Sequence, residues 1–94
     1  MTRLKDKVIW ITGACGGLGK NFCKAFLGEG ASICLTDIDE DLIADTLAEF
    51  DAAEKMMGAV VDVCRRSTIE ASVSRMVAHF GKLDALVNVA GGSL

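Results

Sequence analysis

The stretch that decides the fold is Thr12-Gly13-Ala14-Cys15-Gly16-Gly17-Leu18-Gly19, which holds four glycines in eight residues. Before it, residues 7–11 form an apolar run rich in β-branched side chains, which is typical of a buried parallel strand. After it, apolar residues recur at helical spacing as far as Gly28 or Gly30, where glycine can end a helix. A glycine-rich turn lets the backbone approach a pyrophosphate, and the free N–H groups at the helix start face the anion. The stretch therefore predicts a strand, a phosphate-binding turn and a helix.

The rest of the chain repeats this alternation. Apolar runs at 31–36, 56–61 and 83–89 predict three more strands. Each strand-and-helix unit takes roughly 30 residues, so the 94 residues supply about three units and one extra strand. We expect an α/β fold in which a Rossmann-type parallel sheet of about four strands carries helices on both faces. A complete doubly wound domain has about six strands, so this fold is incomplete.

Two further helices are expected between these runs. Asp39 is predicted to cap the first, and the capping box Ser67-Thr68-Ile69-Glu70 to open the second, which Gly81 ends. Their apolar faces are predicted to comprise Leu42, Ile43, Leu47 and Phe50 in the first helix, and Ile69, Val73, Met76, Val77 and Phe80 in the second.

Composition narrows the class of protein. A net charge of −3 disfavours binding to nucleic acid or to an anionic membrane surface. The longest aliphatic or aromatic run at the N-terminal end is Val8-Ile9-Trp10-Ile11. It is shorter than the ~18 residues of a membrane span and the roughly 7–15 of a signal-peptide core, so we expect a cytoplasmic protein. The cysteines form no C-x-x-C pair, so no metal site is predicted, and we expect reduced thiols that pack as small apolar side chains. The four are Cys15, Cys23, Cys34 and Cys64.

Spacing within the loop separates three kinds of phosphate-binding turn. A P-loop needs Ser or Thr after its lysine, but Lys20 is followed by Asn21, which has no hydroxyl for magnesium. The tight Rossmann pattern G-x-G-x-x-G fails because Gly17-Leu18-Gly19 leads to Phe22. The pattern present is T-G-x-x-x-G-x-G.

This pattern resembles that of the short-chain dehydrogenase/reductase family, and further landmarks follow in the family's order. Asp37 ends the second predicted strand, Asp62-Val63 follows the third, and Asn88-Val89-Ala90-Gly91 ends the fourth. The resemblance covers essentially the whole chain. It implies an oxidoreductase that transfers hydride between a nicotinamide cofactor and an alcohol or ketone. Residues 1–94 would be the N-terminal NAD-binding part of a single Rossmann domain.

Asp37 selects between the two nicotinamide cofactors in this interpretation. It follows Gly19 by 18 residues, and an acid at that place can accept both ribose hydroxyls of adenosine. The carboxylate would repel a 2′-phosphate, and no Arg or Lys at 14–16 or 38–41 offsets this repulsion, so NAD is favoured over NADP. The alternative is that Asp37 caps the next helix, although Asp39 is better placed to do so.

The resemblance also assigns the ends of the other strands. It implies that Asp62 binds the adenine amino group, with a strand-ending turn as the alternative role, and that Val63 packs on the ring. Thr12 would tie the loop to the fourth strand, and the Asn88 motif would line the path to the nicotinamide ribose, although Val89 replaces the family's second Asn. The predicted cofactor site is Thr12, Gly13, Cys15, Gly16, Gly17, Leu18, Gly19, Asp37, Ile38, Asp62, Val63, Asn88, Ala90 and Gly91.

Two side chains are given structural roles. Cys15 is interpreted as a small filler in the loop; the alternative is a partly exposed thiol whose pKa the helix N-terminus lowers. His79 is predicted at the last turn of a helix, where the helix dipole favours a cation, and it has no second metal ligand nearby in sequence.

The catalytic part of the family pattern is missing. The family handles its proton with the Tyr of a Y-x-x-x-K motif, and this chain has no tyrosine, so no catalytic residue is assigned, Ser93 included. Three interpretations stay open: a truncated part of an oxidoreductase, a non-catalytic dinucleotide-binding module, and a structural remnant. Whether the chain alone is an enzyme is left undecided. Its fourth strand would leave Leu86, Val87 and Val89 at an open edge, so we expect either a marginally stable monomer or a species that self-associates through this edge.

Overall fold

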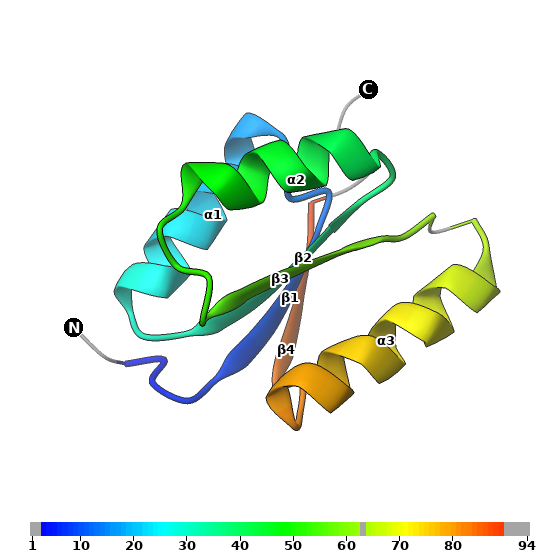
Figure 1. Ribbon diagram of the computed structural model, residues 1–94. Coiled ribbons are helices and arrows are strands. Elements are labelled where there is room, and N and C mark those ends of the chain that lie inside the picture. The colour runs from blue at the N-terminus through cyan, green and yellow to red at the C-terminus, as the bar shows by residue number, and fades with distance from the viewer. Residues whose placement is uncertain (1–2, 63, 90–94) are drawn as a thin grey trace.

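A computed structural model describes residues 3–62 and 64–89 of the chain (Figure 1). Strands and helices alternate along the whole of it, as the sequence predicts. The elements are β1 (Val8–Thr12), α1 (Gly17–Gly28), β2 (Ser32–Asp37), α2 (Glu40–Glu49), β3 (Met56–Val60), α3 (Arg66–Phe80) and β4 (Ala85–Asn88).

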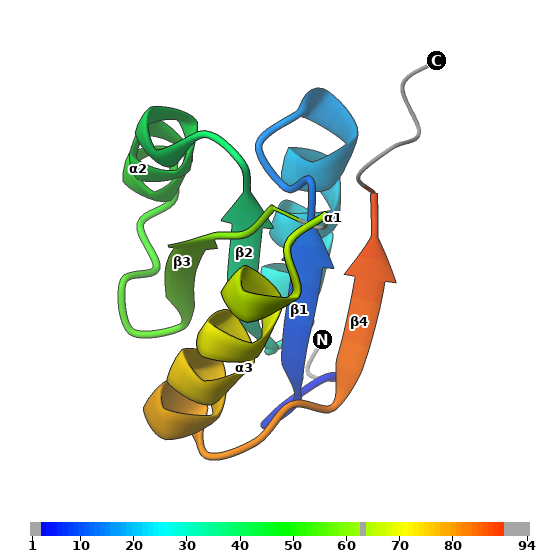
Figure 2. The ribbon, with the colours of Figure 1, turned by 90° about the vertical axis from the view of Figure 1, so that its right-hand side faces the viewer.

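The strands form one parallel sheet in the order β3-β2-β1-β4. Helices α1 and α2 cover one face and α3 covers the other (Figures 1 and 2). The predicted α/β class and Rossmann-type arrangement are therefore confirmed. Because successive strand side chains point to opposite faces, β1 supplies both layers of the core. Ile9 and Ile11 pack beneath α1 and α2, whereas Val8 and Trp10 pack beneath α3.

The start of α3 differs from the prediction. The helix begins at Arg66, so Ser67 lies inside it, and its N-cap residue Arg65 makes no side-chain cap bond. The hydroxyl of Thr68 lies 2.9 Å from the carbonyl oxygen of Asp62, to which it donates, and it accepts the Asp62 N–H at 3.1 Å. The hydroxyl also lies 2.8 Å from the carbonyl oxygen of Arg65. The predicted capping box is wrong because the helix begins before Ser67 and the side chain of Thr68 bonds the turn that precedes the helix.

Three predicted core positions are also wrong. Leu42 and Val77 are 47% and 41% exposed, because each lies at the margin of its helix's buried face. The face beneath α2 contains Ile43 with the buried Thr46. Cys64, in the connection after β3, is exposed, whereas the other three cysteines are buried and all four are free thiols. Burial raises the pKa of Cys23 to about 11 and that of Cys34 to about 12.

The start of β4 is held to the start of β1 by Asp84. Its Oδ2 accepts the backbone N–H of Val8 at 2.8 Å and lies 3.1 Å from Nζ of Lys82. The bond from Val8, followed by the contact with Lys82, lowers the pKa of the Asp84 carboxyl. A lowered pKa means that the ionised carboxylate stabilises the fold, so this contribution is lost as the pH falls through the folded-state pKa.

We expect Asp84→Ala to lower the urea midpoint of unfolding at pH 7, and we expect this difference to shrink as the pH falls through the folded-state pKa and the parent carboxyl takes up a proton. Circular dichroism of both chains between pH 7 and 2.5 measures this difference. Asp51→Ala, which removes an exposed acid from the α2–β3 connection, is the control and should leave the midpoint unchanged. Equal midpoints for Asp84→Ala and the parent at pH 7 would contradict the assignment.

Strand β4 lies at an edge of the sheet. Among the described residues it pairs only with β1, and its Leu86 side chain is 57% exposed. The open edge presents unpaired backbone groups next to apolar surface, which favours pairing with another chain.

No helix within residues 3–62 and 64–89 is long and apolar enough to cross a membrane.

When the 94 residues are expressed alone, we expect concentration-dependent self-association at micromolar concentrations, and Leu86→Lys should reduce it because a charge on an edge strand opposes pairing. Analytical gel filtration with light scattering measures the mass. Val77→Lys adds the same charge on α3, away from the edge, and should not reduce association. A parent chain that stays monomeric throughout the micromolar range would rule out this use of the edge.

Candidate functional site

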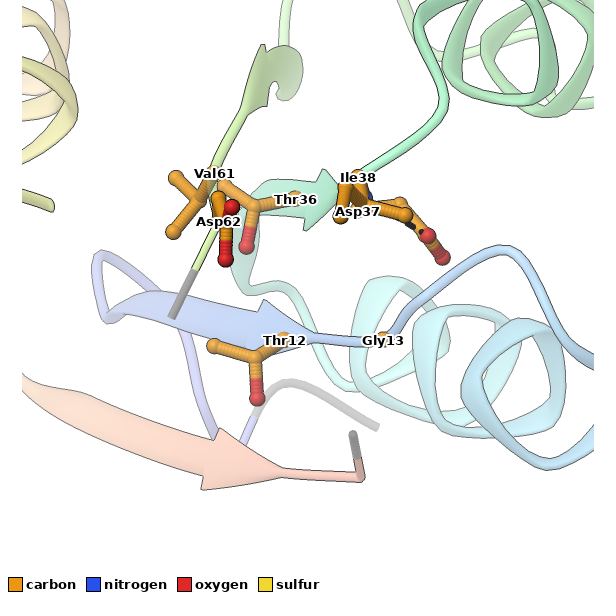
Figure 3. Close-up of a pocket in the computed structure, with 7 residues that line it drawn as sticks. All are labelled: Thr12, Gly13, Thr36, Asp37, Ile38, Val61 and Asp62. Atoms are coloured by element: carbon orange, nitrogen blue, oxygen red, sulfur yellow. Dashed lines mark hydrogen bonds between the residues drawn. The ribbon is translucent and has the colours of Figure 1, made fainter. Parts of the chain in front are cut away.

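A hollow of about 200 Å³ lies at the carboxyl ends of β1, β2 and β3 (Figure 3). Ligands of open parallel sheets bind at this end of the strands. The hollow is lined by Thr12, Gly13, Thr36, Asp37, Ile38, Val61 and Asp62. Thr36 and Val61 are absent from the predicted site. Both are buried β-branched residues at strand ends, and the sequence does not distinguish such a residue that lines a hollow from one that packs in the core.

The loop after β1 turns at Gly13 and is fastened to β2. Gly13 has a φ of 65°, in the left-handed region that favours glycine. The next N–H, from Ala14, donates to the carbonyl oxygen of Thr36 at 3.2 Å. The N–H of Cys15 then donates to Oδ2 of Asp37 at 3.3 Å. These bonds direct the chain away from β1 and into α1.

The remaining loop glycines serve two different needs. A Cβ on Gly19 would lie 2.6 Å from the Cα of Ala14, so only glycine lets α1 pack this close to the loop. A Cβ on Gly16 or Gly17 would meet nothing within 4 Å, and neither residue has a positive φ. The described part of the fold therefore does not require glycine at position 16 or 17. The space beside these two residues, at the start of α1, is open.

The start of α1 is suited to an anion. Its N-cap residue, Gly16, makes no side-chain cap bond, and the first turn contains no acidic residue. The first N–H groups of a helix have no partner within the helix, and together with the helix dipole they attract negative charge. Leu18 in this turn is 60% exposed. The arrangement can therefore bind a phosphate group through main-chain N–H groups.

Asp37 ends β2 and lines the hollow (Figure 3). Its Oδ1 accepts the N–H of Ile38 at 2.8 Å, and its Oδ2 accepts that of Cys15. It does not cap α2: Asp39 does so, by accepting the N–H groups of Asp41 and Leu42 at 2.9 and 3.2 Å. The predicted cap is thus confirmed, and the Asp37 carboxylate lies at the hollow instead.

Asp62 also borders the hollow, but part of its side chain serves the local turn. Its Oδ1 accepts the N–H of Cys64 at 2.9 Å, and its carbonyl oxygen accepts that of Arg65. This is the strand-ending turn that the sequence gives as the alternative role for Asp62. Val63 lies outside the described residues.

The predicted tie between the loop and the fourth strand is present. The Thr12 hydroxyl donates to Oδ1 of Asn88 at 2.8 Å, and the N–H of Val89 donates to the carbonyl oxygen of Thr12 at 3.1 Å. The ends of β1 and β4 are therefore joined by side-chain and main-chain bonds. Ala90 and Gly91, the other two predicted residues of this segment, lie outside the described residues.

The surroundings of Cys15 and His79 indicate a structural role for each side chain. Cys15 is 9% exposed, and burial raises the pKa of its thiol, so it is a filler and not an activated nucleophile. His79 is exposed in the last turn of α3, with its ring 4.5 Å edge-on from that of Phe80. Within the described part of the chain, no group of three His, Cys, Asp or Glu residues could hold a metal ion.

Comparison with known proteins identifies the family. The family model described as short chain dehydrogenase matches residues 7–94. The chain belongs to the short-chain dehydrogenases. A short-chain dehydrogenase structure from Mycobacterium smegmatis superposes with a TM-score of 0.89 at 31% identity, over 97% of this chain and 39% of that one.

Two further relatives of this short-chain dehydrogenase are named as reductases. A diacetyl reductase of Staphylococcus epidermidis is 42% identical over 89 residues, 92% of this chain and 34% of the relative. The 3-ketoacyl-(acyl-carrier-protein) reductase of Brucella melitensis, solved with NADH, has a TM-score of 0.79 at 31% identity, covering 88% of this chain and 33% of the reductase. The chain spans about a third of the length of such relatives.

The glycines of this short-chain dehydrogenase provide a matched pair of variants. We expect Gly19→Ala to lower the free energy of unfolding by about 1–3 kcal/mol, because the methyl group overlaps the main chain of Ala14. Gly17→Ala should leave stability unchanged or raise it by up to about 1 kcal/mol, since alanine favours helix and meets open space. Urea titrations followed by circular dichroism compare the two. Equal losses would refute the distinction between packing and open glycines.

Proposed function

We propose that this chain binds the adenosine and pyrophosphate part of NAD. The observation that carries the proposal is the pairing of two features: a carboxylate in a hollow at the strand ends, and an uncapped glycine helix start beside it. The first suits a ribose diol and the second suits a diphosphate. The NADH bound by the reductase of Brucella melitensis supports the same ligand class.

The lining of the hollow matches the parts of adenosine. Ile38 is 66% exposed beside the hollow, and together with Val61 it can contact the adenine ring. The Asp62 oxygen that does not serve the turn can accept from the adenine amino group. Asp37 accepts the ribose hydroxyls. Each role is assigned to these residues as part of the proposal.

The choice of NAD over NADP rests on charge. A 2′-phosphate on the ribose would meet the Asp37 carboxylate, and like charges in contact oppose binding. Lys20, the basic residue closest in sequence to the glycine loop, pairs with Glu49 at 2.7 Å and is not directed to Asp37. The described hollow has no basic residue in its lining. Neutral ribose hydroxyls, which donate to the carboxylate, are preferred.

The reaction of the complete protein is proposed from the family. NAD would supply the acceptor for a hydride taken from an alcohol, or NADH the hydride for a ketone. This chain's part is to bind and orient the dinucleotide as part of a single Rossmann domain in the cytoplasm. It has no tyrosine to handle the proton, so we assign it no catalytic residue.

Calorimetric titration with NADH and, separately, NADPH tests the proposal. We expect NADH to bind about tenfold or more tightly than NADPH, and Asp37→Ala to remove that preference. Gly17→Ala, which places a methyl group at the proposed pyrophosphate site, should weaken both nucleotides equally. Asp39→Asn is the control, since Asn caps a helix as well as Asp and the residue does not line the hollow. A folded chain that binds neither nucleotide would overturn the proposal.

A further inference from the structure

The Asp37 carboxylate is engaged by the chain itself. Oδ1 accepts the N–H of Ile38 at 2.8 Å, and Oδ2 accepts that of Cys15 at 3.3 Å, across 22 residues of sequence. The first bond fixes the rotation of the carboxylate against its own backbone. The second joins the end of β2 to the middle of the glycine loop.

The loop has few other attachments at this end. Ala14, the preceding residue, donates its N–H to the carbonyl oxygen of Thr36 at 3.2 Å. The next described main-chain donor with a partner is Lys20, whose N–H bonds to Gly16 within α1. Asp37 therefore holds the last point at which the loop is fastened to the sheet before the helix begins.

The bonds leave the carboxylate able to bind a ligand. An ionised carboxylate has about four acceptor positions, and two of these are used, one on each oxygen. Each oxygen keeps a position for a donor such as a hydroxyl. Because the side chain is already fixed, a diol that binds it orders no further rotamer.

We propose that Asp37 is a positioning residue that latches the glycine loop onto the end of β2, so that one side chain sets both the ribose contact and the phosphate-binding turn. The latch itself is a property of the free chain. Its link to ribose and pyrophosphate rests on the proposed function. The latch predicts that loss of the carboxylate opens the loop even when no nucleotide is bound.

Cys15 provides an internal reporter of loop opening. Its side chain is 9% exposed and belongs to the core cluster beneath α1 and α2, against Thr46 of α2. Cys23 and Cys34 are fully buried in helix and sheet, so they become accessible only when the whole fold opens. Cys64 is exposed and must be replaced, as Cys64→Ser, to leave the buried thiols as the only targets.

The test is the rate at which iodoacetamide alkylates Cys15 in the Cys64→Ser chain, followed by peptide mass spectrometry. Each rate is divided by the fraction of ionised thiol, taken from the pH dependence of that variant, because burial and the nearby Asp37 carboxylate both raise the pKa of Cys15. We expect Asp37→Ala to raise this rate roughly tenfold and Asp37→Asn to raise it less, since Asn keeps one acceptor oxygen. Cys23 and Cys34 should stay unlabelled. Asp39→Asn, which removes the same charge two residues away, should leave the Cys15 rate unchanged. An Asp37→Ala rate equal to that of Asp39→Asn would overturn the latch.

A second measurement decides the matter if the Asp37 variants fail to fold, which simultaneous labelling of Cys23 and Cys34 would reveal. In the unmodified chain, the Cys15 amide should exchange its hydrogen more slowly than those of Gly16 and Gly17, after correction for intrinsic rates, because only Cys15 donates to a carboxylate. Equal exchange at the three amides would exclude the latch.

NADH separates this inference from the proposed function. If the variants open the loop but NADH does not slow Cys15 alkylation in the parent, the latch stands and the nucleotide proposal fails. If NADH protects Cys15 while the variants label no faster than the control, the nucleotide proposal stands and the latch fails. If both the latch and the nucleotide proposal are correct, NADH slows Cys15 alkylation in the parent chain, and it slows it several-fold less in Asp37→Ala.

Discussion

The close approach of α1 to the loop that precedes it is the constraint on which the site depends. Any side chain at Gly19 would overlap the main chain of Ala14, so the absence of a Cβ sets how near the helix comes to the end of β1. The start of α1 therefore lies close beside the loop whose Gly13 lines the hollow at the strand ends.

Polar residues at the carboxyl ends of the strands connect the elements that surround the hollow. Thr12 bonds to Asn88 and joins β1 to β4, whereas Asp37 bonds to the loop and joins β2 to the start of α1. Thr68 fastens the start of α3 to Asp62 at the end of β3. The residues proposed to bind the nucleotide therefore also position the elements around it, which makes stability and binding measurements complementary.

Errors in the sequence interpretation share a cause. The capping box at Ser67 is a sound local signal, but Thr68 finds partners on Asp62, which precedes it by six residues, and these decide the first turn of α3. Leu42 and Val77 fit a helical apolar stripe, yet their exposure depends on how the helices rotate against the sheet. Asp39 was predictable because its cap bonds reach only two and three residues ahead.

The sequence alone determined the alternation of strands and helices, the parallel sheet, the family and the glycine loop, because each depends on residue types at fixed spacing. It also placed Asp37 and Asp62 at strand ends. Only the tertiary structure decided that Thr36 and Val61 line the hollow, and that Asp37 bonds to Cys15. It also separated Gly19, which packing requires, from Gly16 and Gly17, which face open space. These facts depend on distances between segments far apart in the chain, which no spacing within one segment specifies.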